Sequence, residues 1–144
     1  MLFRSAPHCL TIEEFLWREM QAGRISQEAF TGQPADLLVH GHCHGKALAG
    51  MEALMGVLNF PRHYTARAVD SGCCGMAGSF GYEAEHYPVS MKMGELVLFP
   101  AVREAGPETI VVAPGTSCRH QIHDGTGVRA LHPVEVLDAA LCGK

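Results

Sequence analysis

The amino-acid sequence predicts a single α/β domain, built on a mostly parallel sheet of about four strands with helices on both faces. Short apolar runs of strand length alternate along the chain with longer segments whose apolar residues recur at helical spacing. This alternation is typical of parallel sheets whose strands are joined by right-handed crossovers. Length and composition agree, because 144 residues that are 47% hydrophobic and 18% charged suffice for one globular core.

The balance of charge argues against several classes of partner. The formal net charge is −4, and no run of Lys and Arg suggests binding to nucleic acid or to an anionic membrane surface. No apolar run approaches the roughly 18 residues of a membrane span. No export signal is visible, which favours a cytoplasmic location, with any membrane association made through a partner. We interpret Met1–Ser5 as non-native sequence and the chain as the C-terminal piece of a longer protein.

The first 35 residues are expected to form an N-terminal helical extension. Thr11 and Glu14 make an S/T-x-x-E capping box, the apolar residues that follow keep helical spacing, and Gly23 is a plausible stop. Residues 36–144 are expected to hold the sheet.

The expected elements of residues 36–144 alternate between strand and helix. Pro88 suits a first helical turn, Pro100 is expected to kink or split its helix, and Thr116 or Ser117 is expected to cap the helix that follows the third strand. The expected strands are 36–40, 64–69, 109–113 and 128–131, and the expected helices are 47–58, 88–105, one that begins near 116, and one that opens at His132–Pro133.

Cysteines follow three of these strands. Cys43 lies just after the first strand, Cys73 and Cys74 after the second, and Cys118 after the third. Because the carboxyl ends of parallel strands lie at one edge of a sheet, the four thiols are expected to converge in one crevice. The remaining cysteines, Cys9 and Cys142, are left outside the site.

Glycines surround the adjacent cysteines. Two neighbouring thiols can serve one centre only where the backbone turns sharply, and glycine permits such a turn and a close approach to the main chain. Gly72, Gly75 and Gly78 are therefore predicted to form the cofactor side of this loop. The segment after the loop is expected to begin a helix.

The thiols allow three kinds of chemistry. Thiolates select soft metals, and four of them suit a [4Fe–4S] cluster or a zinc ion. A labile disulfide between Cys73 and Cys74 is the third alternative. Near the thiols, His42, His44 and His120 are candidate replacement ligands or proton relays, and Arg119 could bind an anionic acceptor or pair with a surface carboxylate.

Three segments resemble the cysteine-rich CCG domain, whose pattern is a Cys at the first strand end, then Cys-Cys-Gly, then Cys-x-x-Cys. The matching segments are Gly41–His44, Gly72–Gly78 and Gly115–Ile122. The family occurs in the B subunit of heterodisulfide reductase, in the iron–sulfur subunit of glycolate oxidase, and at the C-terminus of fused FAD-linked oxidases of D-2-hydroxy acids. The segment 114–122 and His132–Pro133 look closest to the fused oxidases.

The resemblance implies an iron–sulfur-binding electron-transfer module that is not catalytic alone. It implies metal binding by Cys43, Cys73, Cys74 and Cys118, and a place for Ser117 and Arg119 beside the cofactor. Electrons would come from FAD on a separate domain or subunit that oxidises D-lactate, glycolate or D-2-hydroxyglutarate, and would pass to a downstream acceptor. No Gly-x-Gly-x-x-Gly loop for FAD occurs in this chain.

The sequence departs from the family pattern at one position. Gln121 stands where the last Cys of Cys-x-x-Cys is expected. This departure speaks against the double cluster of the heterodisulfide reductases and leaves a single cluster, or zinc in a structural or docking domain, as the alternatives.

Overall fold

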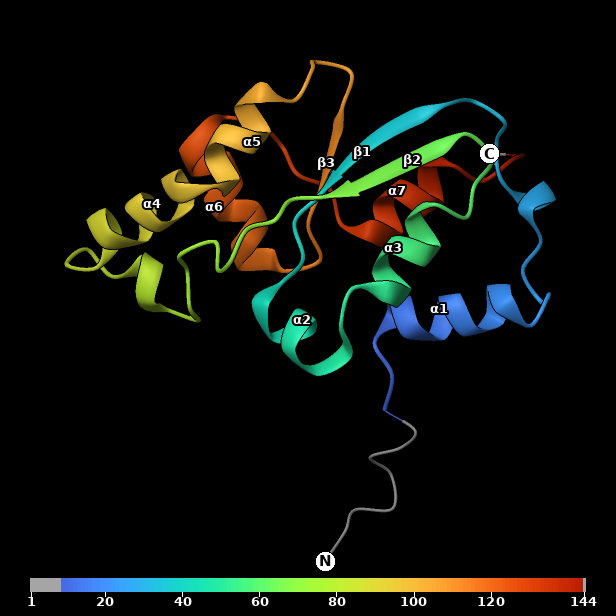
Figure 1. Cartoon of the computed structure of the whole chain (residues 1–144), viewed down its shortest axis with the longest axis horizontal. Helices are drawn as coiled ribbons and strands as arrows, with labels where there is room; N and C mark the ends of the chain where they lie inside the picture. Colours follow the sequence, from blue (N-terminus) through green and yellow to red (C-terminus); the bar gives the residue numbers. More distant parts are fainter. Residues whose placement is uncertain (1–8, 144) are drawn as a thin grey trace, which may run out of the picture.

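The computed structural model describes residues 9–143, so the interpretation of Met1–Ser5 lies outside the described residues. Three parallel strands form one sheet: β1 (Ala35–Val39) lies in the centre, between β2 (Tyr64–Ala68) and β3 (Ile110–Val112). Helices flank both faces, as Figure 1 shows. The predicted α/β class and parallel sheet are confirmed. Within residues 9–143, no helix combines the length and the apolar character that crossing a membrane requires.

The expected fourth strand is reduced to a single bridge. Leu131 pairs in parallel with Val112, accepting a hydrogen bond from Ala113 N (2.9 Å) and donating one to Val111 O (2.8 Å). A left-handed glycine, Gly127 (φ 73°), precedes the segment, and a helix N-cap follows it directly. Too few residues remain between these two ends for a longer ladder, so the prediction of four strands was wrong by one.

Both faces of the central strand β1 are buried over residues 37–39, where successive side chains point to opposite faces of the sheet. Leu37 and Val39 pack into one core cluster, whereas Leu38 packs into the other. The helices α1, α3 and α7 lie on the first face, and α4, α5 and α6 lie on the second (Figure 1).

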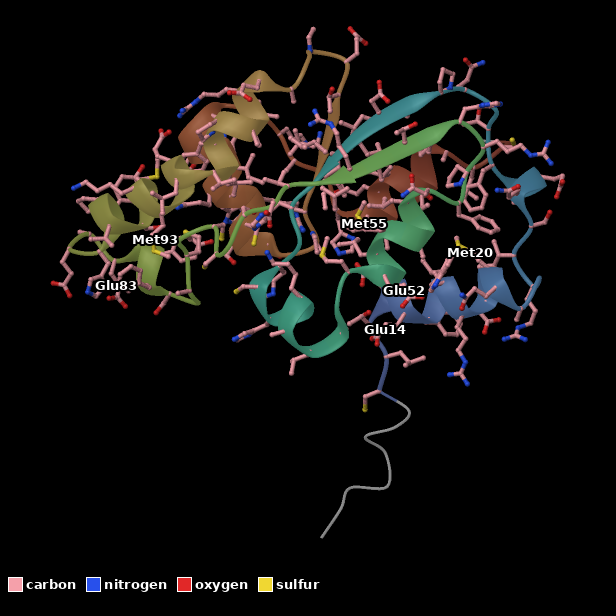
Figure 2. All side chains as sticks on the ribbon, viewed as in Figure 1. Glu14, Met20, Glu52, Met55, Glu83 and Met93 are labelled. Atoms are coloured by element: carbon pink, nitrogen blue, oxygen red, sulfur yellow. The ribbon has the colours of Figure 1, made fainter. Side chains whose placement is uncertain are left out.

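The first face is covered by α1 (Ile12–Gln21), α3 (Glu52–Leu58) and α7 (Pro133–Ala139). The capping box of Thr11 and Glu14 is present as predicted. Trp17 packs on Gly56 so closely that a Cβ there would overlap the indole ring. Met20 of α1 and Met55 of α3, both labelled in Figure 2, belong to the same core cluster. The N-terminal segment therefore shares a core with the sheet, and the domain boundary at residue 35 stays a prediction.

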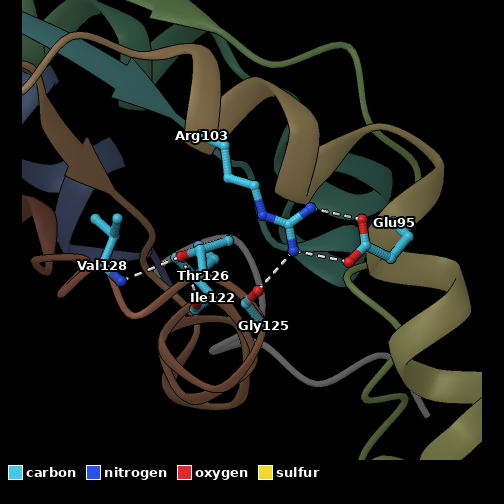
Figure 3. Close-up of polar contacts among 6 residues, drawn as sticks. All are labelled: Glu95, Arg103, Ile122, Gly125, Thr126 and Val128. Carbon is cyan, nitrogen blue, oxygen red and sulfur yellow. Dashed lines mark hydrogen bonds and ion pairs between the residues drawn. The ribbon is translucent and has the colours of Figure 1, made fainter.

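The second face is covered by α4 (Tyr87–Leu96), α5 (Leu98–Glu104) and α6 (Thr116–Thr126). The fully buried ring of Phe99 fills the space that Gly94 and Gly125 leave open. Arg103 ties the three helices together, because it makes a two-pronged ion pair with Glu95 (2.8 and 2.7 Å) and donates to the Gly125 carbonyl (2.8 Å), as Figure 3 shows.

Two of the predicted helices are interrupted. The helix expected over 47–58 is divided into α2 (Cys43–Ala49) and α3, because Gly50 takes a left-handed conformation (φ 72°) and ends α2. Leu48 is consequently 88% exposed instead of facing the core. A helical apolar period does not reveal such a break.

The helix expected over 88–105 is broken at Val97, three residues before the predicted kink. Proline cannot donate the hydrogen bond that a continuous helix would need from residue 100 to the carbonyl of Leu96. The chain restarts at Leu98, so Pro100 falls in a first turn, where no such donor is needed. Two single-turn 3₁₀ helices, η2 (Gln27–Ala29) and η3 (Phe80–Tyr82), complete the described elements.

Candidate metal centre

The loops after the three strands bring four thiols into one site. Cys43 is the first residue of α2, Cys118 lies in the first turn of α6, and Cys73 and Cys74 lie in the loop after β2. That loop does not lead directly into a helix as expected, since η3 and then α4 follow only later. The thiols of Cys43 and Cys73 are hydrogen-bonded, as are those of Cys74 and Cys118. Cys118 also interacts electrostatically with Cys43 and Cys73.

Half of this site is shielded from solvent. Ligand atoms of His40, Cys74 and Cys118 all lie within 4.8 Å of one another, and the three residues are only 1%, 3% and 1% exposed. Cys43 and Cys73 are half-buried and lie toward the surface. The site thus has a closed inner side and an accessible outer side.

The inner thiols differ strongly in acidity. A hydrogen bond from the Cys118 thiol, helped by His40 and by the backbone at Met76, lowers the pKa of Cys74 from 9.0 to about 4 although burial opposes the shift. The same hydrogen bond, together with burial, raises the pKa of Cys118. The two sulfurs therefore share one proton, with the thiolate on Cys74. Burial and the neighbouring Cys73 raise the pKa of Cys43.

His40 was missed as a site residue by sequence reasoning, which treated it as the end of a strand. Its Nδ1 is hydrogen-bonded to Ser71 Oγ (2.8 Å), while its Nε2 is buried and has no hydrogen-bond partner within residues 9–143. The alternation of side chains along a strand could have identified His40. It lies two residues after Leu38, and Leu38 faces the side of the sheet where Cys74 and Cys118 are buried.

The glycines of the loop have different roles. Gly75 has a φ of 104°, and a Cβ there would overlap the Ser90 carbonyl. Its N–H donates to Cys73 Sγ (3.3 Å), so the backbone touches the thiol as expected for this loop. Gly78 also has a positive φ (72°), but the space around its Cβ position is open, and Gly72 needs neither the conformation nor the space.

Side chains from two helices hold the loop in place. Lys46 of α2 donates from Nζ to the carbonyls of Ser71 and Gly72. Gln121 of α6 donates from Nε2 to the Cys74 carbonyl (3.0 Å) and to the carbonyl and hydroxyl of Ser90 (3.0 and 2.9 Å). The residue in place of the last Cys of Cys-x-x-Cys is thus a buried brace between the loop and α4.

The other predicted residues surround the thiols without a common role. Arg119 donates from Nη1 to the carbonyls of Ala113 (3.0 Å) and Pro114 (2.9 Å), so it braces the turn before α6 and pairs with no carboxylate there. Ser117 is half-buried in the first turn of α6. The cap of that helix is Gly115, which corrects the expectation of Thr116 or Ser117, because neither side chain makes a capping hydrogen bond.

Of the predicted histidines, His42 lies near a cysteine of the site, whereas His44 and His120 are exposed. The ring of His42 and the sulfur of Cys118 lie so near Gly115 that a Cβ there would touch both. His44 is exposed, with its ring centre 5.7 Å from that of His42. His120 is exposed and bonds through Nδ1 to the Tyr82 hydroxyl (2.8 Å), away from the sulfurs. An open, mainly apolar cavity of about 340 Å³ borders His42 and His44.

Comparison with known proteins places the chain near dehydrogenases. It is 29% identical to the C subunit of the anaerobic glycerol-3-phosphate dehydrogenase of Escherichia coli K12, over 93% of this chain and 33% of that protein. It is 38% identical to the D-2-hydroxyglutarate dehydrogenase of Escherichia coli K12 over 67% of this chain and 10% of that protein, and 35% identical to that of Haemophilus influenzae over 90% and 13%.

The matched region is a small part of these relatives. The chain spans about a third of the first relative and about a tenth of the others. No family model matches the chain. No solved structure matches it either.

Proposed function

We propose that this chain is an electron-transfer module of an oxidoreductase and that it holds an iron–sulfur cluster on Cys43, Cys73, Cys74 and Cys118. The observation that carries the proposal is the convergence of four thiols from three strand ends. By thiol count the cluster is [4Fe–4S]. The relatives are dehydrogenases, which supports a role in oxidation and reduction.

The residues of the site fit a soft metal centre. Thiolates are the ligands that iron–sulfur clusters and zinc prefer, and Cys74 is already ionised at neutral pH. One ring nitrogen of His40 lies within 4.8 Å of the sulfurs of Cys74 and Cys118, and the buried Nε2 has no hydrogen-bond partner among residues 9–143. A bound cluster would supply one-electron oxidation and reduction. The chain itself orients the thiolates, shields Cys74 and Cys118 from water, and donates the Gly75 N–H to Cys73 Sγ.

The electron donor is proposed to be a flavin domain or subunit, carrying FAD, outside this chain. The relatives are several times longer than the matched region, which leaves room in them for such a domain. The relatives named D-2-hydroxyglutarate dehydrogenase favour a 2-hydroxy acid of that type as the substrate of the complete enzyme, with D-lactate and glycolate as chemical neighbours, whereas the first relative is named for glycerol-3-phosphate. The electrons would then leave to a downstream acceptor.

A single zinc ion in a structural or docking domain is the second candidate. It is favoured by one observation: the ligand atoms of His40, Cys74 and Cys118 lie within 4.8 Å of one another. Such crowding suits a tetrahedral ion with bonds of about 2.0–2.3 Å. The disulfide alternative gains no such support, since Cys73 interacts with Cys43 while Cys74 interacts with Cys118.

Metal analysis after purification without air decides between these candidates. We expect iron and acid-labile sulfide in equal amounts, together with a brown colour. Stoichiometric zinc without sulfide would replace the cluster by the zinc alternative. Protein that is colourless and free of metal, even after incubation with iron and sulfide, would contradict both metal proposals.

Replacement of single cysteines tests the assignment of the ligands. Cys43→Ser, Cys73→Ser, Cys74→Ser and Cys118→Ser should each lose most of the bound metal, because a hydroxyl is a poor ligand for a soft ion. Cys142→Ser is the matched control, since Cys142 is exposed and outside the site. Equal metal loss in the control would mean that the site has been placed wrongly.

A further inference from the structure

We infer that His40 supplies a nitrogen ligand to the metal centre, so that the site is a mixed imidazole–thiolate centre. The inference rests on the single-ion candidate of the proposed function, because four cysteines already ligate every iron of a [4Fe–4S] cluster. It adds a ligand from the end of β1 that the cysteine pattern does not contain. One ring nitrogen of His40, Cys74 Sγ and Cys118 Sγ already lie within 4.8 Å of one another. Three donors at such mutual distances can meet on one metal ion without rearrangement of the backbone.

The burial of Nε2 needs an explanation. His40 is 1% exposed, and no described residue forms a hydrogen bond with its Nε2. Buried polar atoms are almost always satisfied, because removal from water without compensation is unfavourable. A metal ion between Nε2 and the two sulfurs would satisfy this atom and would neutralise the thiolate beside it.

The other ring nitrogen is held as metal-binding histidines require. Nδ1 is 2.8 Å from Ser71 Oγ, and Ser71 is only 7% exposed. When Nδ1 donates its proton to this hydroxyl, Nε2 carries the free lone pair and is the nitrogen that is available to a metal ion. Ser71 precedes the cysteine loop, and its carbonyl accepts a hydrogen bond from Lys46, so the orienting hydroxyl sits on a braced segment.

The alternative replacement ligands are less well placed. The Gln121 amide, which stands at the position of the missing cysteine, is engaged with Cys74 and Ser90. His120 is bonded to Tyr82. Among residues 9–143, His40 is the histidine that meets two cysteine sulfurs in a candidate ligand cluster.

Cadmium enriched in its spin-active isotope is a direct probe of these ligands. The ion is soft and diamagnetic, and its nucleus couples through bonds to protons of its own ligands. We load the metal-free full chain with this isotope and record a proton–cadmium correlation spectrum. The expected result is a correlation from cadmium to the ring protons of His40, along with correlations to the β protons of Cys74 and Cys118.

Two variants sharpen the assignment. In His40→Ala the ring correlation should disappear, and in His40→Cys it should be replaced by one further β-proton correlation. His123→Ala is the control, since His123 is exposed in the last turn of α6, and its spectrum should equal that of the parent. The parent spectrum decides even where a variant fails to fold.

The outcomes separate the inference from the proposed function. Cysteine correlations without any histidine correlation would overturn the role of His40 and leave the thiolate metal site intact. A correlation to another histidine would also overturn it. A chain that binds no cadmium through its thiols would overturn both the inference and the proposed metal site.

Discussion

Cys74 and Cys118 form a hydrogen-bonded pair with very different pKa values, in which Cys74 is the thiolate and Cys118 is the protonated thiol. The Cys118 thiol donates to the Cys74 thiolate, which lowers the pKa of Cys74 to about 4 and raises that of Cys118. The metal-free site therefore stores one negative charge in a buried place. Such a charge attracts a cation, and the proton on Cys118 is what the cation must displace.

Metal uptake should consequently release protons at neutral pH. Cys74 is already ionised above about pH 4, whereas the raised pKa values of Cys118 and Cys43 keep these two thiols protonated. Each displaced proton should lower the apparent affinity about tenfold for every unit by which the pH falls. Calorimetric titration with zinc in buffers of different ionisation enthalpy measures the number released. A pH-independent affinity would contradict the protonation states assigned to Cys118 and Cys43.

Gln121 has a structural task that a cysteine could not perform. Gln121→Ala removes the side-chain donor from the buried Cys74 carbonyl and from Ser90, and the loss of such a buried hydrogen bond costs about 1–3 kcal/mol. We expect the free energy of unfolding to fall by that order in urea titrations. Gln121→Cys should also be destabilised and should bind no additional metal. A gain of metal in Gln121→Cys would show that the position faces the centre after all.

At the scale of elements, the conformation of the loop of residues 71–79 depends most on Gly75, which has both a positive φ and no room for a Cβ. Gly75→Ala should be strained at a φ of 104° and should press on the Ser90 carbonyl, at a cost of about 1–3 kcal/mol. Metal occupancy should fall sharply while far-ultraviolet circular dichroism stays nearly unchanged. Gly72→Ala is the matched control from the same loop, because its Cβ position is open and its φ is not positive. Equal occupancy in both variants would mean that the loop is only a turn.

The elements also show what the sequence could and could not predict. The convergence of the four thiols could be predicted from the sequence, because apolar runs locate the ends of strands and the ends of parallel strands share one edge of the sheet. These thiols belong to Cys43, Cys73, Cys74 and Cys118. The break at Gly50 was missed and the break at Val97 was expected at Pro100, because a helical apolar period continues across a residue that interrupts the hydrogen bonds. The hydrogen bond between His40 and Ser71 joins residues that follow two different strands, so no local sequence pattern could predict it.

At the scale of the whole molecule, two apolar clusters on opposite faces of the sheet stabilise the fold, and only one of them includes residues of the site, Cys74 and Cys118. The metal-free protein should therefore be folded, and bound metal should add to its stability. At a free metal concentration of about 100 times Kd the gain is about 2.7 kcal/mol. For a domain of this size we expect the Tm to fall by several degrees, roughly 5–15 °C, when a chelator removes the metal. Calorimetry with and without chelator measures the shift.

Two variants serve as controls for the shift in Tm on chelation. Phe99→Ala should lower the Tm with and without metal, because it opens a cavity in the core that costs about 3–5 kcal/mol. Cys118→Ser should lower the Tm of the metal-treated protein only to the chelated value and should not respond to the chelator. A large response to the chelator in Cys118→Ser would place the metal elsewhere.

The spacing of the ligands along the chain has a consequence for the order of events in folding. Cys43, Cys74 and Cys118 lie on loops that are separated by complete crossovers, so they meet only after β1 has paired with both β2 and β3. An unfolded chain offers a metal only ligands that are close in sequence, such as the adjacent thiols of Cys73 and Cys74 or the thiol of Cys43 with its neighbouring histidines. None of these local sets contains the ligands of all three strand ends. The metal has to be inserted into a sheet that already exists, through the side on which Cys43 and Cys73 remain accessible.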